Sequence, residues 1–510
     1  MSQSSPDVNI QLIAGQAQFG LGLRKQLILA QGTSGGSFTS GNLIENVPTS
    51  NDELKALCGA NSLAYLAIKA FKETNKESPL SAIIVADNAS GVAATGSIAL
   101  TVSSPKNDKA IFIIGSGDKN KYEIDVVSTS TATTIGDALA ALINADENAI
   151  VSASNSSGTI TFTAKNKGTE ANQYAICAEK LPIGVSAVIT AFSGGATDPV
   201  ITGVLNKIKN ARYDIATQKC FLSEVKTHLE TKFNTLNQVY ESYCTASQVD
   251  SYANVQTALG SLASKVINVV YIKTANESNV KGSSFFEIPL VLSSKLLATD
   301  SLRLVPDAPI ANFMQAPNVS GGINKLAVPF HSVKVPNAYK IQQGISWLDE
   351  EIKGIEELGG SVLVMDDSNL NVVTRPRYMT VYKKATLTDD GQTYQNLNKF
   401  LNSSIVKETV YKQWKKRYAQ PVLTSGKIPS AVSDVIYVDV KSAKATLLSI
   451  FKEMSEQGIV QLDENGPLQQ AFEKSLIINI STATNTMSGS ASYYNMGQLE
   501  KISFNLTANS

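Results

Sequence analysis

The sequence predicts an α/β fold joined to a β-rich part, and two patterns indicate it. In residues 26–86, and again in 200–298, short runs of consecutive apolar residues alternate with segments whose apolar residues recur at helical spacing. Apolar runs of this kind are typical of strands buried on both faces, and their alternation with helices favours a parallel sheet. Between these regions, residues 94–198 are rich in Ser, Thr and Gly and consist mostly of short strand-like runs, as expected of a β-rich module.

The domain organisation follows from these shifts in composition. The 510 residues are too many for one ordinary domain, and a Gly/Pro cluster at 194–199 closes the β-rich segment before the α/β pattern resumes. We therefore predict an α/β domain split by an inserted β-rich domain, then an α+β C-terminal core, with extended strand arms at both chain ends. The predicted bounds are 1–22 (N-terminal arm), 23–93 and 199–331 (split α/β domain), 94–198 (inserted β-rich domain), 332–496 (C-terminal core) and 497–510 (C-terminal arm).

The N-terminal arm is predicted from strict alternation. Val8, Ile10 and Leu12 are apolar, and the residues between them are polar, which indicates a strand with one buried face. Glycines separate this strand from the body of the chain. An isolated strand cannot satisfy its own backbone groups, so it must pair with a sheet in this chain or in another.

The body elements follow in order. In the split α/β domain we predict strands at 26–30, 81–86, 213–217 and 266–272, and helices at 52–58, 62–72, 201–209, 221–233, 247–263 and 289–298. In the insert we predict one helix at 135–143 and strands at 98–102, 110–114, 122–127, 151–153, 160–164, 175–178 and 185–191.

The C-terminal core is organised by residues 360–427. Two neighbouring strands, 361–365 and 370–374, flank a short polar turn, and a long amphipathic helix follows at 394–418. Beyond it we predict an extended segment at 431–440, a helix at 444–457 and a strand at 476–481. At the chain end Ile502, Phe504 and Leu506 alternate with polar residues, so the C-terminal arm is a second amphipathic strand.

Composition excludes several classes of function. Lys+Arg and Asp+Glu both number 44, so the chain has no bulk positive field of the kind that attracts nucleic acid. No apolar run approaches the roughly 18 residues of a membrane-spanning helix, and no secretory signal pattern is found at the N-terminus. The balanced charge supplies little repulsion between copies, which suits a self-assembling protein.

Candidate catalytic and metal-binding residues are few. Cys58, Cys177, Cys220 and Cys244 form no C-x-x-C pair and lie near no histidine, so we expect reduced, mostly buried thiols and no metal. His228 lies in the middle of a predicted helix, four residues after a glutamate with which it can pair at the surface. His331 lies in a predicted loop.

One loop matches the letters of a catalytic motif. Residues 32–36, Gly-Thr-Ser-Gly-Gly, follow a predicted strand as a nucleophile elbow or a phosphate loop does. No helix follows the serine directly, and the Lys-Ser/Thr of a P-loop is missing, so we interpret the match as chance. We expect no enzyme, no catalytic residue, no cofactor and no metal.

Two features have both an ordinary and a functional interpretation. A basic strip lies on the helix at 394–418, where it is either a solvated face or a surface for an acidic partner; its residues are Lys407, Lys412, Lys415, Lys416 and Arg417. The two arm strands either pair within their own fold or join neighbouring copies by β-augmentation.

The order of motifs in the C-terminal core resembles that of contractile phage tail sheath proteins, and of the Mu-like tail sheath family in particular. The matching segments are Gly-Ile-Ser at 344–346, the apolar strand, Val-Val-Thr-Arg at 372–375, Thr-Val-Tyr at 380–382, Asp-Asp-Gly at 389–391 and the helix with a basic end. The order of elements in the insert also resembles the insertion found in Mu-like sheaths.

This resemblance implies a subtilisin-like topology for the α/β domain, without subtilisin's chemistry, and a structural role. A sheath subunit polymerises around the tail tube and contracts to drive the tube through the target cell envelope. The implied partners are further copies in stacked hexameric rings, the tail tube protein, and the baseplate and tail terminator proteins. The implied location is the tail sheath of a virion assembled in the host cytoplasm, with the arms linking neighbouring subunits and the basic helix facing the tube.

A second class of function stays open from the residues. The insert could be the binding module of a carbohydrate-binding or surface-adhesion protein. Its few aromatic residues are scattered, however, and carbohydrate sites usually gather such rings into a platform.

Overall fold

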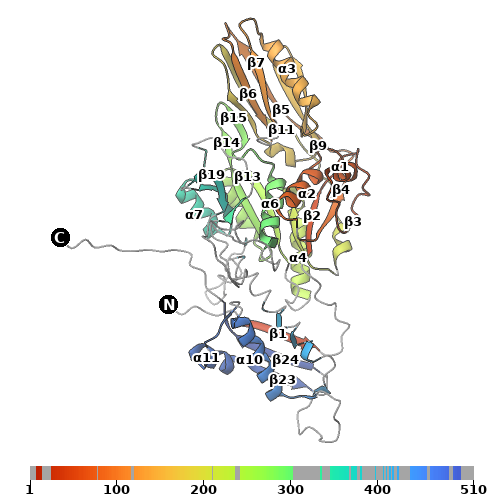
Figure 1. The fold of residues 1–510 in the computed structure, drawn as a ribbon, viewed down its shortest axis with the longest axis vertical. Helices are drawn as coiled ribbons and strands as arrows, with labels where there is room; N and C mark the ends of the chain where they lie inside the picture. The colour runs from red at the N-terminus through yellow and green to blue at the C-terminus, as the bar shows by residue number, and fades with distance from the viewer. Residues whose placement is uncertain are drawn as a thin grey trace, which may run out of the picture.

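The structure is a computed structural model, and it describes a large part of the chain (Figure 1). The described residues are 7–13, 25–76, 78–115, 120–209, 211–235, 242–302, 333–335, 345–366, 369–375, 380–381, 397, 406, 409–410, 413–414, 416–418, 422–423, 437–456, 460–463, 465–481 and 486–495. Among them no helix is both long and apolar enough to cross a membrane.

A parallel sheet forms the centre of the body, as predicted. Its five longer parallel strands are β4 (Leu80–Val85), β2 (Lys25–Gln31), β12 (Tyr213–Thr217), β13 (Cys244–Asp250) and β14 (Ile267–Asn276), in that spatial order. Every residue of β4 and all but the first of β2 are buried, which is why these strands are continuous apolar runs. The short strand β3 (Leu43–Ile44) pairs antiparallel at the β4 edge.

Helices cover this sheet. α2 (Leu63–Thr74) packs on α6 (Pro289–Leu302), and both contact β2, while α6 also covers β12 and β13. From β2 the chain adds β4 on one side of the sheet, and it then adds β12, β13 and β14 on the other side. Because crossovers between parallel strands are right-handed, α4 (Leu222–Thr235) and α5 (Tyr252–Leu262) lie on the face opposite to α2. The remaining helix of this part, α1 (Asn51–Cys58), packs on α2.

The insert continues the central sheet instead of starting a separate one. β14 pairs antiparallel with β15 (Val280–Ser283), and β15 pairs with β10 (Ile176–Lys180) of the insert. β6 (Asp108–Ile114) and β7 (Lys121–Val126) follow, so the described sheet is 11-stranded. Its buried apolar residues form one continuous core with those of the body.

A second sheet completes the insert. Its strands, in spatial order, are β11 (Val185–Ser193), β5 (Ala93–Val102), β9 (Thr159–Lys167) and β8 (Val151–Ser156). α3 (Ala132–Ala145) packs against β7, β8 and β9, and it begins with a capping box in which Thr131 and Thr134 bond each other's backbone. The predicted β-rich content and single helix of this segment are confirmed.

The C-terminal part has its own small core. α10 (Val440–Glu456) and α11 (Pro467–Ser475) pack against β23 (Ile477–Ser481) and β24 (Thr486–Ser492) at the end of the molecule opposite the insert (Figure 1). α7 (Asp349–Glu357) and β17 (Ser361–Val362) lie instead on the body, where β17 pairs with β14. The predicted hairpin is confirmed as β18 (Val364–Asp366) and β19 (Asn369–Arg375).

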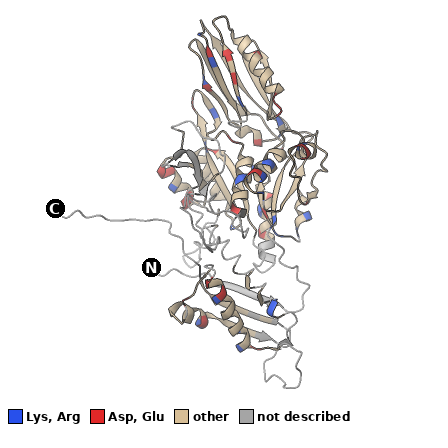
Figure 2. Ribbon diagram, in the orientation of Figure 1, with Lys and Arg blue, Asp and Glu red and all other residues tan. Residues whose placement is uncertain are grey.

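The remaining described elements are short. They are the strands β16 (Val333–Lys334), β20 (Val422–Leu423), β21 (Tyr437–Val438), β22 (Val460–Gln461) and β25 (Tyr494–Asn495), and the 3₁₀ turns η2 (Glu170–Gln173), η3 (Val204–Ile208) and η4 (Lys219–Phe221). Residues of both charges are interspersed over the described ribbon (Figure 2).

One predicted helix is wrong in its first turn and another is wrong in type. The first four residues of the predicted helix at 247–263 belong to strand β13, and residues 252–262 form the helix α5 as predicted. β13 is buried between two parallel strands. Its Thr245 and Ser247 hydroxyls bond Asn268 and Ser293, so polar residues are tolerated there. The strand therefore lacks the continuous apolar run from which buried strands are predicted. The predicted helix at 201–209 is only the 3₁₀ turn η3.

Candidate assembly surfaces

The first candidate surface is a three-stranded sheet in the C-terminal part. β23 and β24 form an antiparallel hairpin, and β1 (Asp7–Ile13) pairs antiparallel with the other side of β24. The register sets the predicted arm residues opposite small or apolar partners: Val8 opposite Ala491, Ile10 opposite Gly489 and Leu12 opposite Met487. The predicted N-terminal strand is confirmed, and in this single chain its partner is the chain's own hairpin.

The hairpin is a rigid base for that strand. Ile478, Met487 and Ala491 are 7%, 5% and 8% exposed and pack on the small core of α10 and α11. In that core the rings of Phe451 and Phe472 lie with centroids 4.4 Å apart. The hairpin is therefore anchored by the burial of side chains on one face, and this anchoring does not depend on whether β1 comes from the same chain or from another.

The outer edge of β23 is the second candidate surface. Among the described residues β23 pairs with β24 alone, and Ile477 on this strand is 56% exposed. An unpaired edge strand offers a row of backbone donors and acceptors to another strand. The predicted C-terminal arm strand, with Ile502, Phe504 and Leu506, lies outside the described residues.

The basic helix is described only in part. Its described residues near the C-terminal end are helical, and its predicted apolar face is confirmed by the burial of Val406, Val410 and Trp414. Lys407, Lys412 and Lys415 lie outside the described residues, and Lys416 is exposed. Arg417 is half-buried and pairs with Glu453 of α10, so it is turned toward the C-terminal core.

The place where an α/β protein usually binds a ligand is closed by the chain itself. Numbered along the chain, the parallel strands have the doubly wound order 2-1-3-4-5, whose ligand crevice opens at the carboxyl ends of the first and third strands, here β2 and β12. Gln31 ends β2, and Gln218 follows β12. The Gln218 Nε2 donates to Gln31 Oε1 at 2.6 Å, and the Gln31 backbone N–H donates to Gln218 Oε1 at 2.8 Å.

Residues of the insert complete this closure. Asp87, which follows β4, accepts hydrogen bonds from Gln31 Nε2 (2.8 Å), Asn166 Nδ2 (3.0 Å) and the Lys167 backbone N–H (3.1 Å). Asn166 Nδ2 also donates to the Gly32 carbonyl, and its Oδ1 accepts from the Leu63 N–H at the start of α2. This network spans residues far apart in sequence, and no local pattern predicts it.

A second contact between insert and body contains a buried carboxylate. Glu170 in η2 is 2% exposed, and among the described residues no donor reaches full hydrogen-bond geometry with either carboxylate oxygen, although the Lys219 backbone N–H lies nearby. Burial raises the pKa of Glu170 to about 7; the nearby Asp198 acts in the same direction, and Lys219 partly offsets both. Three residues along, Gln173 Oε1 accepts from the Val249 N–H of β13 at 2.8 Å.

We expect Glu170→Gln to remove part of the pH dependence of stability. The pKa is raised in the folded state, so the stability that protonated Glu170 contributes is present below about pH 4.5 and is lost as the pH rises through about 7. At pH 8 the free energy of unfolding of the variant should exceed that of the wild type by about 3 kcal/mol, and at pH 4 the two should be about equal. Urea unfolding at both pH values measures this, and an equal change at both would contradict it.

The structure places some of the residues that were considered as catalytic candidates. His228 is half-buried in α4, and His331 lies outside the described residues. The loop at 32–36 folds back on the end of α1, where the Thr33 N–H donates to the Cys58 carbonyl, and no helix follows until Asn51. Within the described part of the chain, no cluster of His, Cys, Asp and Glu could hold a metal ion.

The cysteines are free thiols, as expected. Cys58, Cys177 and Cys244 are buried and Cys220 is half-buried. Burial raises the pKa of the Cys58 and Cys177 thiols to about 12, and raises the pKa of the other two further, so all four are poor nucleophiles at neutral pH.

Comparison with known proteins agrees with the motif resemblance. No family model matches the chain. A Mu-like prophage FluMu tail sheath protein of Haemophilus influenzae is 27% identical over 244 residues, which are 46% of this chain and 49% of the relative. The resemblance to Mu-like tail sheaths is thereby confirmed, although the match spans about half the length of that curated relative.

Among solved structures, a sheath complex of an extracellular contractile injection system (PVC) in its contracted state aligns with this chain. The alignment covers 100% of this chain and 99% of the other, at a TM-score of 0.42 and 9% identity. A TM-score below one half does not establish a common fold.

Proposed function

We propose that this chain is the structural subunit of a contractile tail sheath. Copies polymerise around a tail tube in stacked hexameric rings, and contraction drives the tube through the target cell envelope. The sequence match to a Mu-like prophage tail sheath protein carries this proposal. In this function the chain has no catalytic role, and the free energy of contraction comes from new contacts between subunits.

The arms are the linkers in this proposal. The hairpin β23–β24 receives the β1 strand of a neighbouring copy on one side and a C-terminal arm on the free edge of β23, so one sheet joins several subunits. Two observations support it: seven residues of β1 are in register with β24, and no described strand pairs with the other edge of the hairpin. In this proposal, β1 pairs with its own hairpin in the single chain and with the hairpin of a neighbouring copy in the assembly, as in domain swapping.

The further partners belong to the same proposal. They are the tail tube, met by the basic helix through Lys416 and its neighbours, and the baseplate and tail terminator proteins at the two ends of the sheath. The location is the tail of a phage or phage-like particle assembled in the host cytoplasm. The subtilisin-like topology of the α/β domain also stays a prediction; the observed order of parallel strands supports the broader doubly wound class.

Negative-stain electron microscopy of the purified protein tests this function. We expect helical tubes with hexameric rings, formed without nucleotide. A protein that stays monomeric at all concentrations and salt conditions, and also in the presence of its tail tube protein, would contradict the proposal.

The carbohydrate-binding alternative has no comparable support. The aromatic residues of the insert point inward: Phe112 and Phe162 are 0% exposed, and Tyr122, Tyr174 and Phe192 are 6% or less. They form the core of the insert, where Tyr174 packs edge-on against Phe192, and none is available to stack on a sugar.

A further inference from the structure

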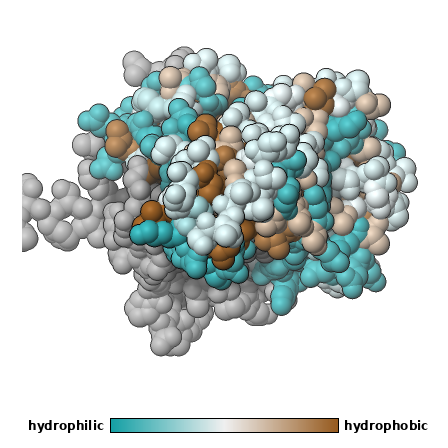
Figure 3. Space-filling view, turned by 90° about the horizontal axis from the view of Figure 1, so that it is seen from above, coloured by the Kyte–Doolittle hydropathy of each residue, from teal (hydrophilic) through white to brown (hydrophobic). Residues whose placement is uncertain are grey.

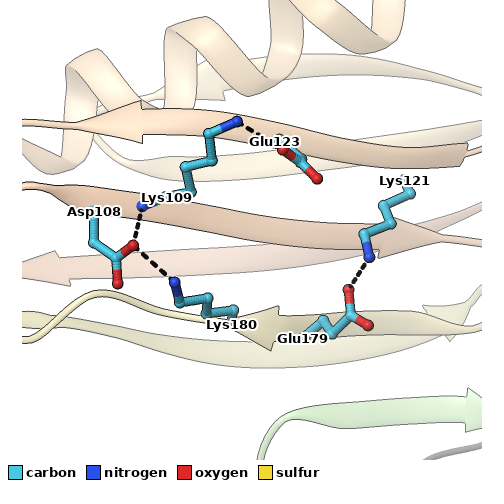
Figure 4. A network of polar contacts seen from close by, with 6 residues as sticks. All are labelled: Asp108, Lys109, Lys121, Glu123, Glu179 and Lys180. Atoms are coloured by element: carbon cyan, nitrogen blue, oxygen red, sulfur yellow. Dashed lines mark hydrogen bonds and ion pairs between the residues drawn. The ribbon is translucent and has the colours of Figure 1, made fainter.

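The two outer faces of the insert differ sharply in chemistry. The outer face of β6, β7 and β10 is charged, and its side chains pair across strands: Lys109 with Glu123 at 2.9 Å, Lys180 with Asp108 at 2.7 Å and Lys121 with Glu179 at 2.8 Å (Figure 4). These charges are exposed and mutually neutralised, so this face is well suited to water.

The outer face of the second sheet carries hydroxyl groups instead. One row of neighbours crosses all of its strands, namely Ser154, Thr161, Ser97 and Thr190. Seen from the insert end, pale residues cover much of the surface, with brown and teal residues interspersed among them (Figure 3). At the β11 edge of this face stands an aliphatic residue, Val188, with 69% of its surface exposed.

The free edges of the insert are not equally protected. β7, at the end of its sheet, carries Lys121, Glu123 and Asp125, charges that discourage pairing with another strand. β8 is covered by α3, where the Asn144 side chain donates to the Ala153 carbonyl at 2.7 Å and accepts from its N–H at 2.9 Å. The backbone groups of Ala153, at the middle of β8, are thereby satisfied within the chain.

β11 has neither protection. It has nine residues, none charged and none proline, and among the described residues it pairs only with β5. The outward-facing Ser186, Val188 and Thr190 are exposed, Ala187 is partly buried against the core, and the strand also contacts β15 and η2. Ile183, just before the strand, is 70% exposed.

We propose that β11 pairs antiparallel with β11 of a second copy, centred on Val188. The sequence is self-complementary in this register: Val188 meets Val188, Ser186 meets Thr190 and Ala187 meets Ile189. Each pair joins residues of the same face, and the most exposed aliphatic side chain of the strand is covered by its own copy. Identical strands without charge have no electrostatic repulsion to overcome.

This contact has two-fold symmetry, which limits where it can occur. The subunits of a helical tube are related by rotation about its axis and translation along it, so neighbours in its wall are not related by a two-fold axis of their own. The β11 pair therefore belongs to the unassembled subunit, as a dimer that must separate before or during polymerisation. The formation of the β11 dimer does not rest on the proposed sheath function, whereas its place before polymerisation does.

Disulfide trapping in the full chain tests the register. We expect Val188→Cys to give a disulfide-linked dimer under mild oxidation, because residues directly opposite in an antiparallel pair lie within disulfide reach. Thr190→Cys alone should give none, whereas a mixture of Ser186→Cys and Thr190→Cys chains should cross-link. The matched control is Val127→Cys, at a residue 47% exposed elsewhere on the insert. The native thiols are buried or half-buried.

The proposal is overturned if Val188→Cys gives no more dimer than Val127→Cys, or if Ser186→Cys chains cross-link with one another. Sedimentation of unpolymerised protein gives a second readout. Val188→Lys should weaken the dimer about tenfold or more by placing like charges opposite each other, and Thr161→Lys, two strands from the edge, should not. Tubes formed by Val188→Lys should be normal, so failure of the dimer and failure of the sheath function give different results.

Discussion

A chain that lacks residues 499–510 is expected to fold and stay soluble but to form no tubes. The deleted segment contains Ile502, Phe504 and Leu506, whose alternation predicts a strand that pairs on the open edge of β23 in another copy. Its removal takes away the backbone hydrogen bonds between subunits and leaves the buried cores of the body, the insert and the C-terminal part unchanged. Circular dichroism measures folding, and sedimentation with electron microscopy measures polymerisation.

A pair of matched variants controls for the loss of length. Aspartate at Ile502, Phe504 and Leu506 puts three charges on the apolar face of the arm and should also abolish tubes. Aspartate at Ser503, Asn505 and Thr507 puts the same charges on the polar face and should leave tubes largely intact. Normal polymers from the truncated chain, or equal effects of the two triple variants, would refute the exchange of arms.

Asp87→Ala is expected to destabilise the joint between body and insert by about 2 to 3 kcal/mol. The carboxylate of Asp87 accepts hydrogen bonds from Gln31, Asn166 and the Lys167 N–H. The two side-chain amides keep other acceptors, the Lys167 and Gly32 carbonyls, whereas the Lys167 N–H loses its partner. Urea unfolding measures the loss of stability, and limited proteolysis near residues 86–93 measures opening of the joint.

Two other variants separate the hydrogen bonds from general surface effects. Asp87→Asn keeps an acceptor oxygen for the Gln31 and Asn166 amides, but its amide nitrogen then faces the Lys167 N–H, so it should restore only part of the stability that Asp87→Ala loses. Asp137→Ala, on α3, removes a carboxylate that accepts from Asn155 at an exposed site, and should cost well under 1 kcal/mol. An Asp87→Ala protein as stable as wild type, with an unchanged proteolysis pattern, would show that the network does not hold the insert in place.

The elements predicted correctly are those whose local pattern and burial agree. β2 and β4 are apolar throughout because both of their faces are covered, and the apolar run alone indicates this. β1 was predicted from its alternation, because one face of a strand in a thin sheet needs apolar residues. The helix at 394–418 was predicted from its amphipathic face, and its described buried residues bear this out.

The elements that were missed depend on neighbours far away in sequence. β24 consists mostly of small and polar residues, Thr-Met-Ser-Gly-Ser-Ala-Ser, and is a strand because β1 and β23 pair on both sides of it. A side chain added at Gly489 would lie 3.0 Å from the Ile477 carbonyl oxygen, so the small residue suits the close approach of the next strand. No propensity for β structure marks this segment.

The sequence by itself determined the classes of element, the β-rich insertion, the strand character of the N-terminal arm and the resemblance to tail sheaths, because hydrophobic periodicity and motif order are local properties. Only the tertiary structure decided that the insert extends the central sheet, that Gln31, Asp87, Asn166 and Gln218 close the crevice, and that β11 pairs with β5 alone among the described strands. The crevice is closed by hydrogen bonds between residues from 56 to 187 positions apart in the sequence. Such pairings are set by the fold as a whole, and no short stretch of sequence encodes them.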